Sequence, residues 1–217
     1  MNFQIARFNM VESQARTWDV LDQRVLDRLL AVPREEFVPR DWKSLAYADM
    51  DLPLGHGEVM LAPKLAARLV QEAAVLETDH VLEIGTGSGY MTALLAGLAA
   101  RVTSVEIRPE WVEPARARLG ALGIGNATIE AGDAALGWPA AAPFDAIVVT
   151  GSLPTLPDEL PAQLAPGGRL VAVVGSAPIM TARLVTRVSP GVFRSAGLFE
   201  TFIAPLRNAR VPERFVF

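Results

Sequence analysis

The residues best suited to chemistry are three glycines that follow a short apolar stretch. Residues 81–84 are apolar except for Glu83, and they lead into Gly85, Gly87 and Gly89. Glycine is needed where the backbone turns with positive φ or where a ligand packs directly against the main chain. The spacing is tighter than in the dinucleotide fingerprint, where the third glycine comes one residue later. A strand, this loop and the helical pattern after it therefore predict a site for a nucleotide-type cofactor.

Two acidic residues follow the loop at the ends of further strand-like stretches. Glu106 ends an apolar stretch 17 residues beyond Gly89, and Asp133 follows the next such stretch, directly after Gly132. In open α/β sheets, a carboxylate at the end of the second strand accepts hydrogen bonds from the ribose hydroxyls of a nucleotide. Each acid alone could be a solvated loop residue. The ordered series of Glu83, Glu106 and Asp133 instead predicts a nucleoside site.

The glycine loop and the acidic residues can form one site only if the fold brings them to the same edge of a sheet. The pattern of the rest of the chain predicts such an α/β fold. Strand-like and helical stretches alternate from residue 80 to about 175, which is typical of a parallel sheet covered on both faces. Residues 3–30 predict two amphipathic helices, and two extended stretches around 189–191 predict a β-hairpin at the sheet edge. We expect one domain over 1–217, made of an amino-terminal helical segment (1–50), a cofactor-binding core (80–175) and carboxy-terminal strands (176–217).

Composition argues against several other classes of protein. The 217 residues are 51% apolar with a net charge of −4, which disfavours disorder and a broad basic surface for nucleic acid. With no cysteine and only two histidines, a cysteine or histidine-rich metal site is not expected. The start of the chain has no signal-peptide pattern, and no apolar run is long enough to span a membrane. We therefore expect a cytoplasmic protein without a metal, a nucleic-acid partner or a membrane segment.

The glycine loop and the strand-end acids together resemble the cofactor site of class I S-adenosylmethionine-dependent methyltransferases. More specific motifs in the flanks are similar to those of the protein-L-isoaspartate O-methyltransferase family. The matching stretches are residues 25–39, with their Val-Pro-Arg-x-x-Phe-Val pattern, and residues 52–57, 83–93, 143–150 and 202–206. The similarity covers about residues 18–206. It implies a Rossmann-like, mostly parallel seven-stranded sheet flanked by helices, with an amino-terminal helical extension.

The resemblance also implies a reaction. A carboxylate of an isoaspartyl residue in a damaged protein would attack the methyl group of S-adenosylmethionine and leave S-adenosylhomocysteine. The methyl ester then closes to a succinimide that can reopen as normal aspartate, which repairs the protein. Carboxylates have unperturbed pKa values of about 4, so the acceptor is ionised at neutral pH and needs no general base. Isoaspartyl proteins or peptides are thus the expected substrates of a monomer or homodimer.

Roles for individual residues follow from the same resemblance. Glu83 would help to orient the ammonium group of the cofactor, Glu106 would hold the ribose hydroxyls, and Asp133 would accept from the adenine amine. Ile107 would pack on an adenine face, and Thr150 would face the methyl-transfer cleft. The remaining cofactor-binding residues would be Gly85, Thr86, Gly87, Ser88 and Gly89 of the loop, together with Gly132.

One stretch departs from the family pattern at the acceptor position. The family has Thr-Ile-Ser there, whereas this chain places Val59 at the threonine and Leu61 at the serine. Glu58 stands where a neutral residue is expected, and His56 lies two residues earlier. We expect these four residues and Thr150 to surround the acceptor. A carboxylate acceptor would lose hydrogen bonds and meet a like charge, which costs more in a dry pocket than in water.

Three hypotheses for the acceptor remain open. The protein methylates isoaspartyl residues with backbone donors from residues 57–61. Alternatively, it methylates another acceptor, with Glu58 or His56 removing a proton from a neutral nucleophile. In the third hypothesis it binds the cofactor without catalysis. Simpler roles also exist: His56 as a turn residue, Glu58 as a solvated acid, and Leu61 as a core residue that narrows the site.

Overall fold

A seven-stranded sheet forms the centre of the protein. The structure, a computed structural model, describes residues 2–211; Met1 and residues 212–217, which end the predicted 176–217 segment, lie outside the described residues. The strand order is β5-β4-β3-β6-β7-β8-β9. Strands β3 to β7 are parallel, and β8 and β9 are added antiparallel at one edge, so the predicted sheet and its closing hairpin are confirmed. The strands are β3 (His80–Ile84), β4 (Arg101–Glu106), β5 (Ala127–Ala131), β6 (Phe144–Val149), β7 (Leu164–Ser176), β8 (Ile179–Ser189) and β9 (Val192–Thr201).

Two apolar clusters lie on the two faces of this sheet. One cluster packs against helices α3 (Pro63–Glu72), α4 (Tyr90–Ala96) and α5 (Pro109–Ala121). The other packs against α6 (Glu159–Ala162) and the irregular segments near it. In β3, Val81 belongs to the first cluster, whereas Leu82 and Ile84 belong to the second, because successive side chains of a strand point to opposite faces. All five residues of β3 are buried, as expected for a central strand of a parallel sheet that is covered on both faces.

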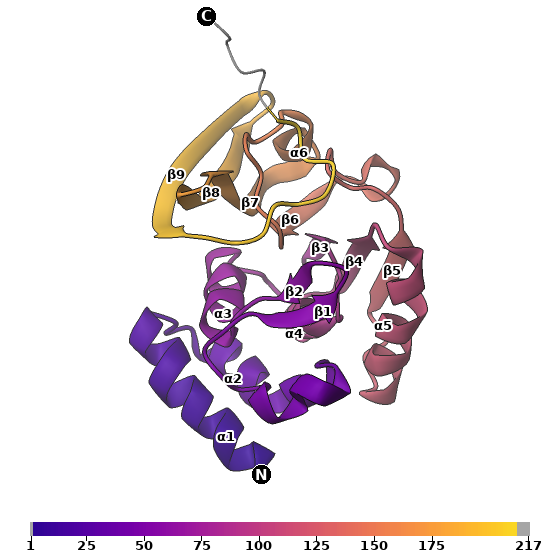
Figure 1. Cartoon of the computed structure of the whole chain (residues 1–217). Helices are drawn as coiled ribbons and strands as arrows, with labels where there is room; N and C mark the ends of the chain where they lie inside the picture. Colours follow the sequence, from indigo (N-terminus) through magenta and orange to yellow (C-terminus); the bar gives the residue numbers. More distant parts are fainter. Residues whose placement is uncertain (1, 212–217) are drawn as a thin grey trace, which may run out of the picture.

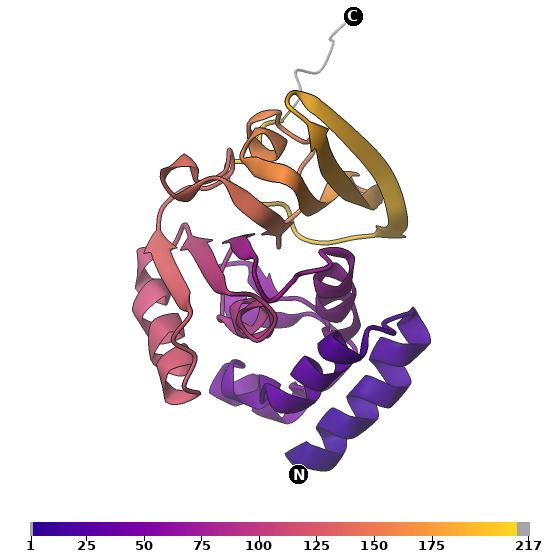
Figure 2. The ribbon, with the colours of Figure 1, turned by 180° about the vertical axis from the view of Figure 1, so that it is seen from behind.

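The amino-terminal segment packs at one end of this core. Its first helix, α1 (Phe3–Met10), ends in further helical turns, and the chain reverses at Asp19, whose φ is 58°. The second helix, α2 (Gln23–Ala31), begins after Asp22, whose side chain accepts a hydrogen bond from the Arg24 amide at 2.9 Å. Figures 1 and 2 show α1 and α2 at the end of the molecule opposite β8 and β9. Short helical turns lie between α1 and α2, at Val11–Ala15 and Arg16–Trp18, and two more follow α2, at Arg34–Glu36 and Arg40–Leu45.

A crevice is expected where the strand order reverses. This occurs at β3, which has β4 on one side and β6 on the other. In open α/β sheets, ligands bind outside the carboxyl ends of the strands at such a point. Two segments contribute walls to the cavity there: the hairpin of β1 (Leu52–Gly55) and β2 (Glu58–Met60), and residues 202–211, called here the carboxy-terminal segment. Both lie on the near side of the molecule in Figure 1.

Residues 2–211, the part of the chain that the structure describes, contain neither a membrane-spanning helix nor a cluster of metal-ligating side chains. No helix in this range combines the length and the apolar character that crossing a membrane requires. Within the same range, no group of three or more His, Cys, Asp or Glu residues is arranged to hold a metal ion.

Candidate cofactor and acceptor site

The glycine loop follows β3 directly and has the backbone conformation that its sequence predicts. Gly85, Gly87 and Gly89 have φ values of 94°, 54° and 89°, a region that side chains with a Cβ rarely adopt. A Cβ on Gly85 would also collide with the side-chain oxygen of Thr150. That hydroxyl lies 2.9 Å from the carbonyl oxygen of Ile84 and 2.8 Å from that of Gly85. Thr150 therefore fastens the loop to the end of β6.

A buried polar network lies beneath the loop. Glu83 is completely buried, and its Oε2 accepts hydrogen bonds from Thr92 at 2.5 Å and from Ser104 at 2.6 Å. The Thr86 hydroxyl extends the network, 2.5 Å from that of Ser104. Burial raises the pKa of Glu83 to about 8, although the two hydroxyl donors oppose the shift. Glu83 thus supports the loop from below, and its predicted contact with the cofactor ammonium group stays a prediction.

Glu106 has the geometry expected of a ribose-binding acid. It ends β4, and only 4% of the residue is exposed. The backbone amide of Gly87 donates to its Oε2 at 2.7 Å, and that of Arg108 donates to its Oε1 at 2.9 Å. Burial raises its pKa, while both backbone amides favour the charged form. The carboxylate is therefore held rigidly in the wall of a cavity, with lone pairs left for further donors.

The cavity lies between the loop, the hairpin and the carboxy-terminal segment, and it brings most of the predicted residues together. Those that line it are Glu58, Val59, Leu61, Gly85, Gly87, Glu106, Ile107, Gly132, Asp133 and Thr150. An adjoining hollow, which shares part of these walls, adds Thr86 and Ser88. Three predicted residues line neither space: His56, Glu83 and Gly89. Gly89 instead directly precedes α4 as its N-cap residue, and Glu83 belongs to the network beneath the loop.

The far end of the cavity carries the predicted adenine acid. Asp133 is exposed, and its Oδ1 accepts a hydrogen bond from the Ala135 amide at 2.9 Å. Its Oδ2 accepts from the side-chain amide of Asn208 at 2.7 Å, which ties the carboxy-terminal segment to this end. Ile107 provides an apolar wall beside Glu106. An apolar wall next to a fixed acceptor is suited to a planar heterocycle with an amino group.

The hairpin forms the opposite wall and differs from the expectation for Glu58. Val59 and Leu61 line the cavity and offer it only apolar side chains. Glu58 is not a free acid, because its Oε1 is ion-paired with Arg207 and lies 3.7 Å from a guanidinium nitrogen of Arg108. The two arginines also donate to the His56 carbonyl, at 3.1 Å and 3.4 Å respectively. The like charge expected beside the acceptor is thus compensated.

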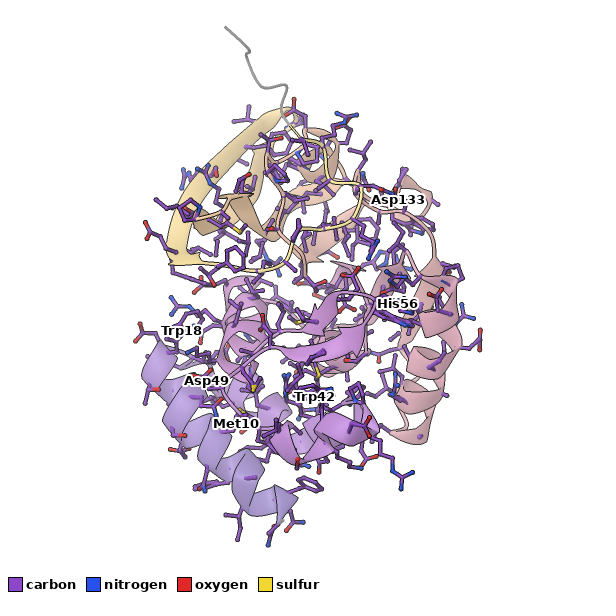
Figure 3. All side chains as sticks on the ribbon, viewed as in Figure 1. Met10, Trp18, Trp42, Asp49, His56 and Asp133 are labelled. Atoms are coloured by element: carbon purple, nitrogen blue, oxygen red, sulfur yellow. The ribbon has the colours of Figure 1, made fainter. Side chains whose placement is uncertain are left out.

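His56 belongs to the turn of the hairpin. Its φ of 55° is left-handed, its side chain is exposed, and its ring centroid lies 6.2 Å from that of Trp111. Figure 3 shows His56 near α5, on the same side of the molecule as Asp133. The structure therefore supports the simpler role of His56 as a turn residue.

Three arginines of this site were missed by the sequence analysis. Arg34 is fully buried and donates to the carbonyl oxygens of Ala46 and Leu61, at 2.7 Å each, so it fixes the backbone of the hairpin wall. Its place in the Val-Pro-Arg motif was a signal, but the motif indicates no role. Arg108 and Arg207 had no local signal. Arg207 is 149 residues from Glu58.

Comparisons with known proteins agree with this geometry. The family model described as protein-L-isoaspartate(D-aspartate) O-methyltransferase matches residues 7–207. A protein-L-isoaspartate O-methyltransferase of Anaeromyxobacter dehalogenans (strain 2CP-1 / ATCC BAA-258) is 46% identical over 191 residues, which are 87% of this chain and 91% of that protein. A protein of the same name from Methanoculleus marisnigri is 45% identical over 169 residues, which cover 78% and 77% of the two chains.

Two solved structures share the fold. A protein-L-isoaspartate O-methyltransferase superposes with a TM-score of 0.79 at 26% identity, over 92% of this chain and 65% of that chain. A Plasmodium falciparum protein described as a protein-L-isoaspartate O-methyltransferase, solved in complex with S-adenosyl-L-homocysteine, gives a TM-score of 0.77 at 21% identity, over 95% and 99%. Fold, cofactor loop and sequence agree with the resemblance. The chain belongs to the protein-L-isoaspartate(D-aspartate) O-methyltransferase family and is an S-adenosylmethionine-dependent methyltransferase.

Proposed function

We propose that this chain methylates isoaspartyl carboxylates of damaged proteins in the cavity between the glycine loop and the β1–β2 hairpin. The observation that carries the proposal is the position of Glu106. Its carboxylate is fastened by the Gly87 amide and lines a cavity whose opposite wall is the hairpin that bears the family's acceptor motif. A nucleoside bound by Glu106 and Asp133 would leave the part of the cavity near Val59, Leu61 and Thr150 for the acceptor.

The residues present suit a reaction that needs alignment more than proton transfer. S-adenosylmethionine supplies a methyl group bound to a positively charged sulfur. A carboxylate oxygen can attack the methyl carbon directly, and S-adenosylhomocysteine leaves. An ordinary carboxylate, with a pKa of about 4, is already ionised at neutral pH. The task of the protein is then to hold both partners in line and to keep water out. The buried side chains of Leu61 and Ile84, and the loop that Thr150 fastens, provide a rigid apolar wall for this purpose.

The pairing of Glu58 favours isoaspartyl methylation over a different acceptor. A neutral nucleophile would require a general base within hydrogen-bond reach of the reacting proton. His56 does not line the cavity, and Glu58 is engaged by Arg207 and Arg108. Neither is positioned as a free base. An acceptor that is already ionised needs none.

A methyl-transfer assay tests the proposal. The protein would be incubated with methyl-labelled S-adenosylmethionine and a peptide that contains one L-isoaspartyl residue. The same peptide with normal aspartate is the control, and lysate protein, transfer RNA and lipid extract are alternative acceptors. We expect label in the isoaspartyl peptide alone, released as methanol in mild base as for an ester. Label in another acceptor, or cofactor binding with no transfer at all, would contradict the proposal.

Assembly, partners and location are further parts of the proposal. We propose a monomer or homodimer that acts in the cytoplasm on protein substrates without nucleic acid. The net charge of −4 supports the last point, because a nucleic-acid surface is usually basic. Sedimentation analysis at several concentrations would distinguish the two assembly states.

A further inference from the structure

We infer that Arg207 binds the carboxylate of the methyl acceptor, and that Glu58 is the counter-ion that Arg207 exchanges for it. The inference rests on the proposed function and concerns how this chain recognises an acidic acceptor after losing the two hydroxyls at residues 59 and 61. Arg207 is a substrate-binding residue in this inference, and Glu58 competes with the substrate.

The charge distribution in the cavity singles out Arg207. Among the described residues that line the cavity, three are acidic and Arg207 alone is cationic. Of the acids, Glu106 is held by two backbone amides, and Asp133 is held by the Ala135 amide and by Asn208. The hairpin residues Val59 and Leu61 cannot donate hydrogen bonds from their side chains. A carboxylate that enters the cavity therefore has one side chain of opposite charge available.

The backbone next to Arg207 is fixed against the end of β6. The Ser152 amide donates to the Ala204 carbonyl, and the Leu206 amide donates to the Ser152 carbonyl, at 2.8 Å each. Gly151 permits this approach, because a Cβ there would lie 2.8 Å from the Leu206 backbone. Thr150 directly precedes this contact, and Arg207 directly follows it. The backbone of Arg207 is therefore held on a rigid support near Thr150, and its guanidinium reaches the hairpin at Glu58 and at the His56 carbonyl.

The contacts of Arg207 in this structure allow it to exchange Glu58 for the carboxylate of an acceptor. Its Nε pairs with Glu58, and one terminal nitrogen donates to the His56 carbonyl at 3.1 Å. The Arg207 side chain is 46% exposed, and an ion pair with that exposure adds little to stability. Arginine also has five N–H donors in a planar fork that matches a carboxylate. The geometry of Arg108 differs: its side chain is only 17% exposed, and its guanidinium lies 5.4 Å from the Trp111 ring centroid.

Variants that remove one charge of the Arg207–Glu58 pair test the inference, because the two variants should change the KM for the acceptor in opposite directions. Arg207→Gln should raise the KM for an isoaspartyl peptide about tenfold or more, as for a lost charge-assisted hydrogen bond. Glu58→Gln should lower that KM, because the competing carboxylate is gone. Both variants should keep the affinity for S-adenosylhomocysteine, measured by calorimetry, within about twofold, which is below the loss of one hydrogen bond. Arg210→Gln is the matched control, since Arg210 pairs with Glu159 at 2.9 Å and does not line the cavity.

Other outcomes overturn the inference. If both variants change the KM in the same direction, the ion pair only closes the cavity and Arg207 does not bind the acceptor. If Arg207→Gln weakens S-adenosylhomocysteine binding and leaves the KM for the peptide unchanged, Arg207 contacts the cofactor and not the acceptor. Binding of the isoaspartyl peptide to the S-adenosylhomocysteine complex separates this inference from the proposed function. Wild-type protein that neither binds nor methylates the peptide refutes both, whereas normal activity and peptide binding in Arg207→Gln refute the inference alone.

Discussion

Replacing Glu106 by alanine should weaken the binding of S-adenosylhomocysteine at least tenfold. Glu106 is only 4% exposed, and the Gly87 and Arg108 amides fix the orientation of its carboxylate by hydrogen bonds of 2.7 and 2.9 Å. Little reorganisation is therefore needed when the ribose binds. A hydrogen bond to a charged group contributes about 1.5–3 kcal/mol, and about 1.4 kcal/mol corresponds to a factor of ten. Loss of one ribose contact would give about tenfold, and loss of two about a hundredfold or more.

Calorimetric titration with S-adenosylhomocysteine measures the effect without turnover. Glu113→Ala is a suitable control, because Glu113 is exposed on α5, pairs with Arg116 and does not line the cavity. A thermal melt of each variant shows whether the protein is still folded. If folded Glu106→Ala binds as tightly as wild-type protein, the assignment of the ribose to Glu106 is wrong.

Three further changes probe the acceptor wall, the loop and the buried network. Leu61→Ser should raise the methylation rate of an isoaspartyl peptide, because it restores a hydroxyl to the cavity wall; an unchanged or lower rate would count against that placement. Gly85→Ala should reduce cofactor affinity and lower the melting temperature, because its Cβ would collide with Thr150 at a φ of 94°, and a variant with wild-type values would contradict the described loop. Burial raises the pKa of Glu83 in the folded state from 4.5 to about 8, so the folded state binds this proton more tightly than the unfolded state. The free energy of unfolding should therefore fall as the pH rises between these two values, by up to roughly 1.4 kcal/mol per pH unit. Glu83→Gln should flatten this part of the pH–stability curve in urea unfolding, and an equally steep curve would show that Glu83 is not its source.

The core of the cofactor site could be predicted from the sequence because its signals are local. Positive φ is a property of single residues, so the spacing of Gly85, Gly87 and Gly89 already indicates a tight loop. Strand ends can be read from apolar runs, and parallel strands bring their carboxyl ends to one edge of the sheet. Glu106 therefore reaches the loop, as its hydrogen bond to Gly87 confirms.

Which of the predicted side chains line the cavity could not be predicted from the sequence in the same way. Glu83 has the residue type and position of a cofactor contact, and in the fold its Oε2 accepts hydrogen bonds from Thr92 and Ser104 beneath the loop. Sequence pattern does not distinguish a side chain that faces a ligand from one that supports the loop. The tertiary structure adds that α4 supplies Thr92 and β4 supplies Ser104 as donors to this carboxylate.

The sequence by itself determined the family, the parallel sheet and the tight glycine loop, because the signals for each come from residues close together in the chain. The tertiary structure decided whether the negative charge of Glu58, on the hairpin wall of the cavity, is compensated. The sequence alone gives Glu58 no partner, whereas in the fold the carboxy-terminal segment brings Arg207, 149 residues away in the chain, into an ion pair with it. No local periodicity encodes such a meeting; it follows from how the antiparallel strands return the chain to the end of β6.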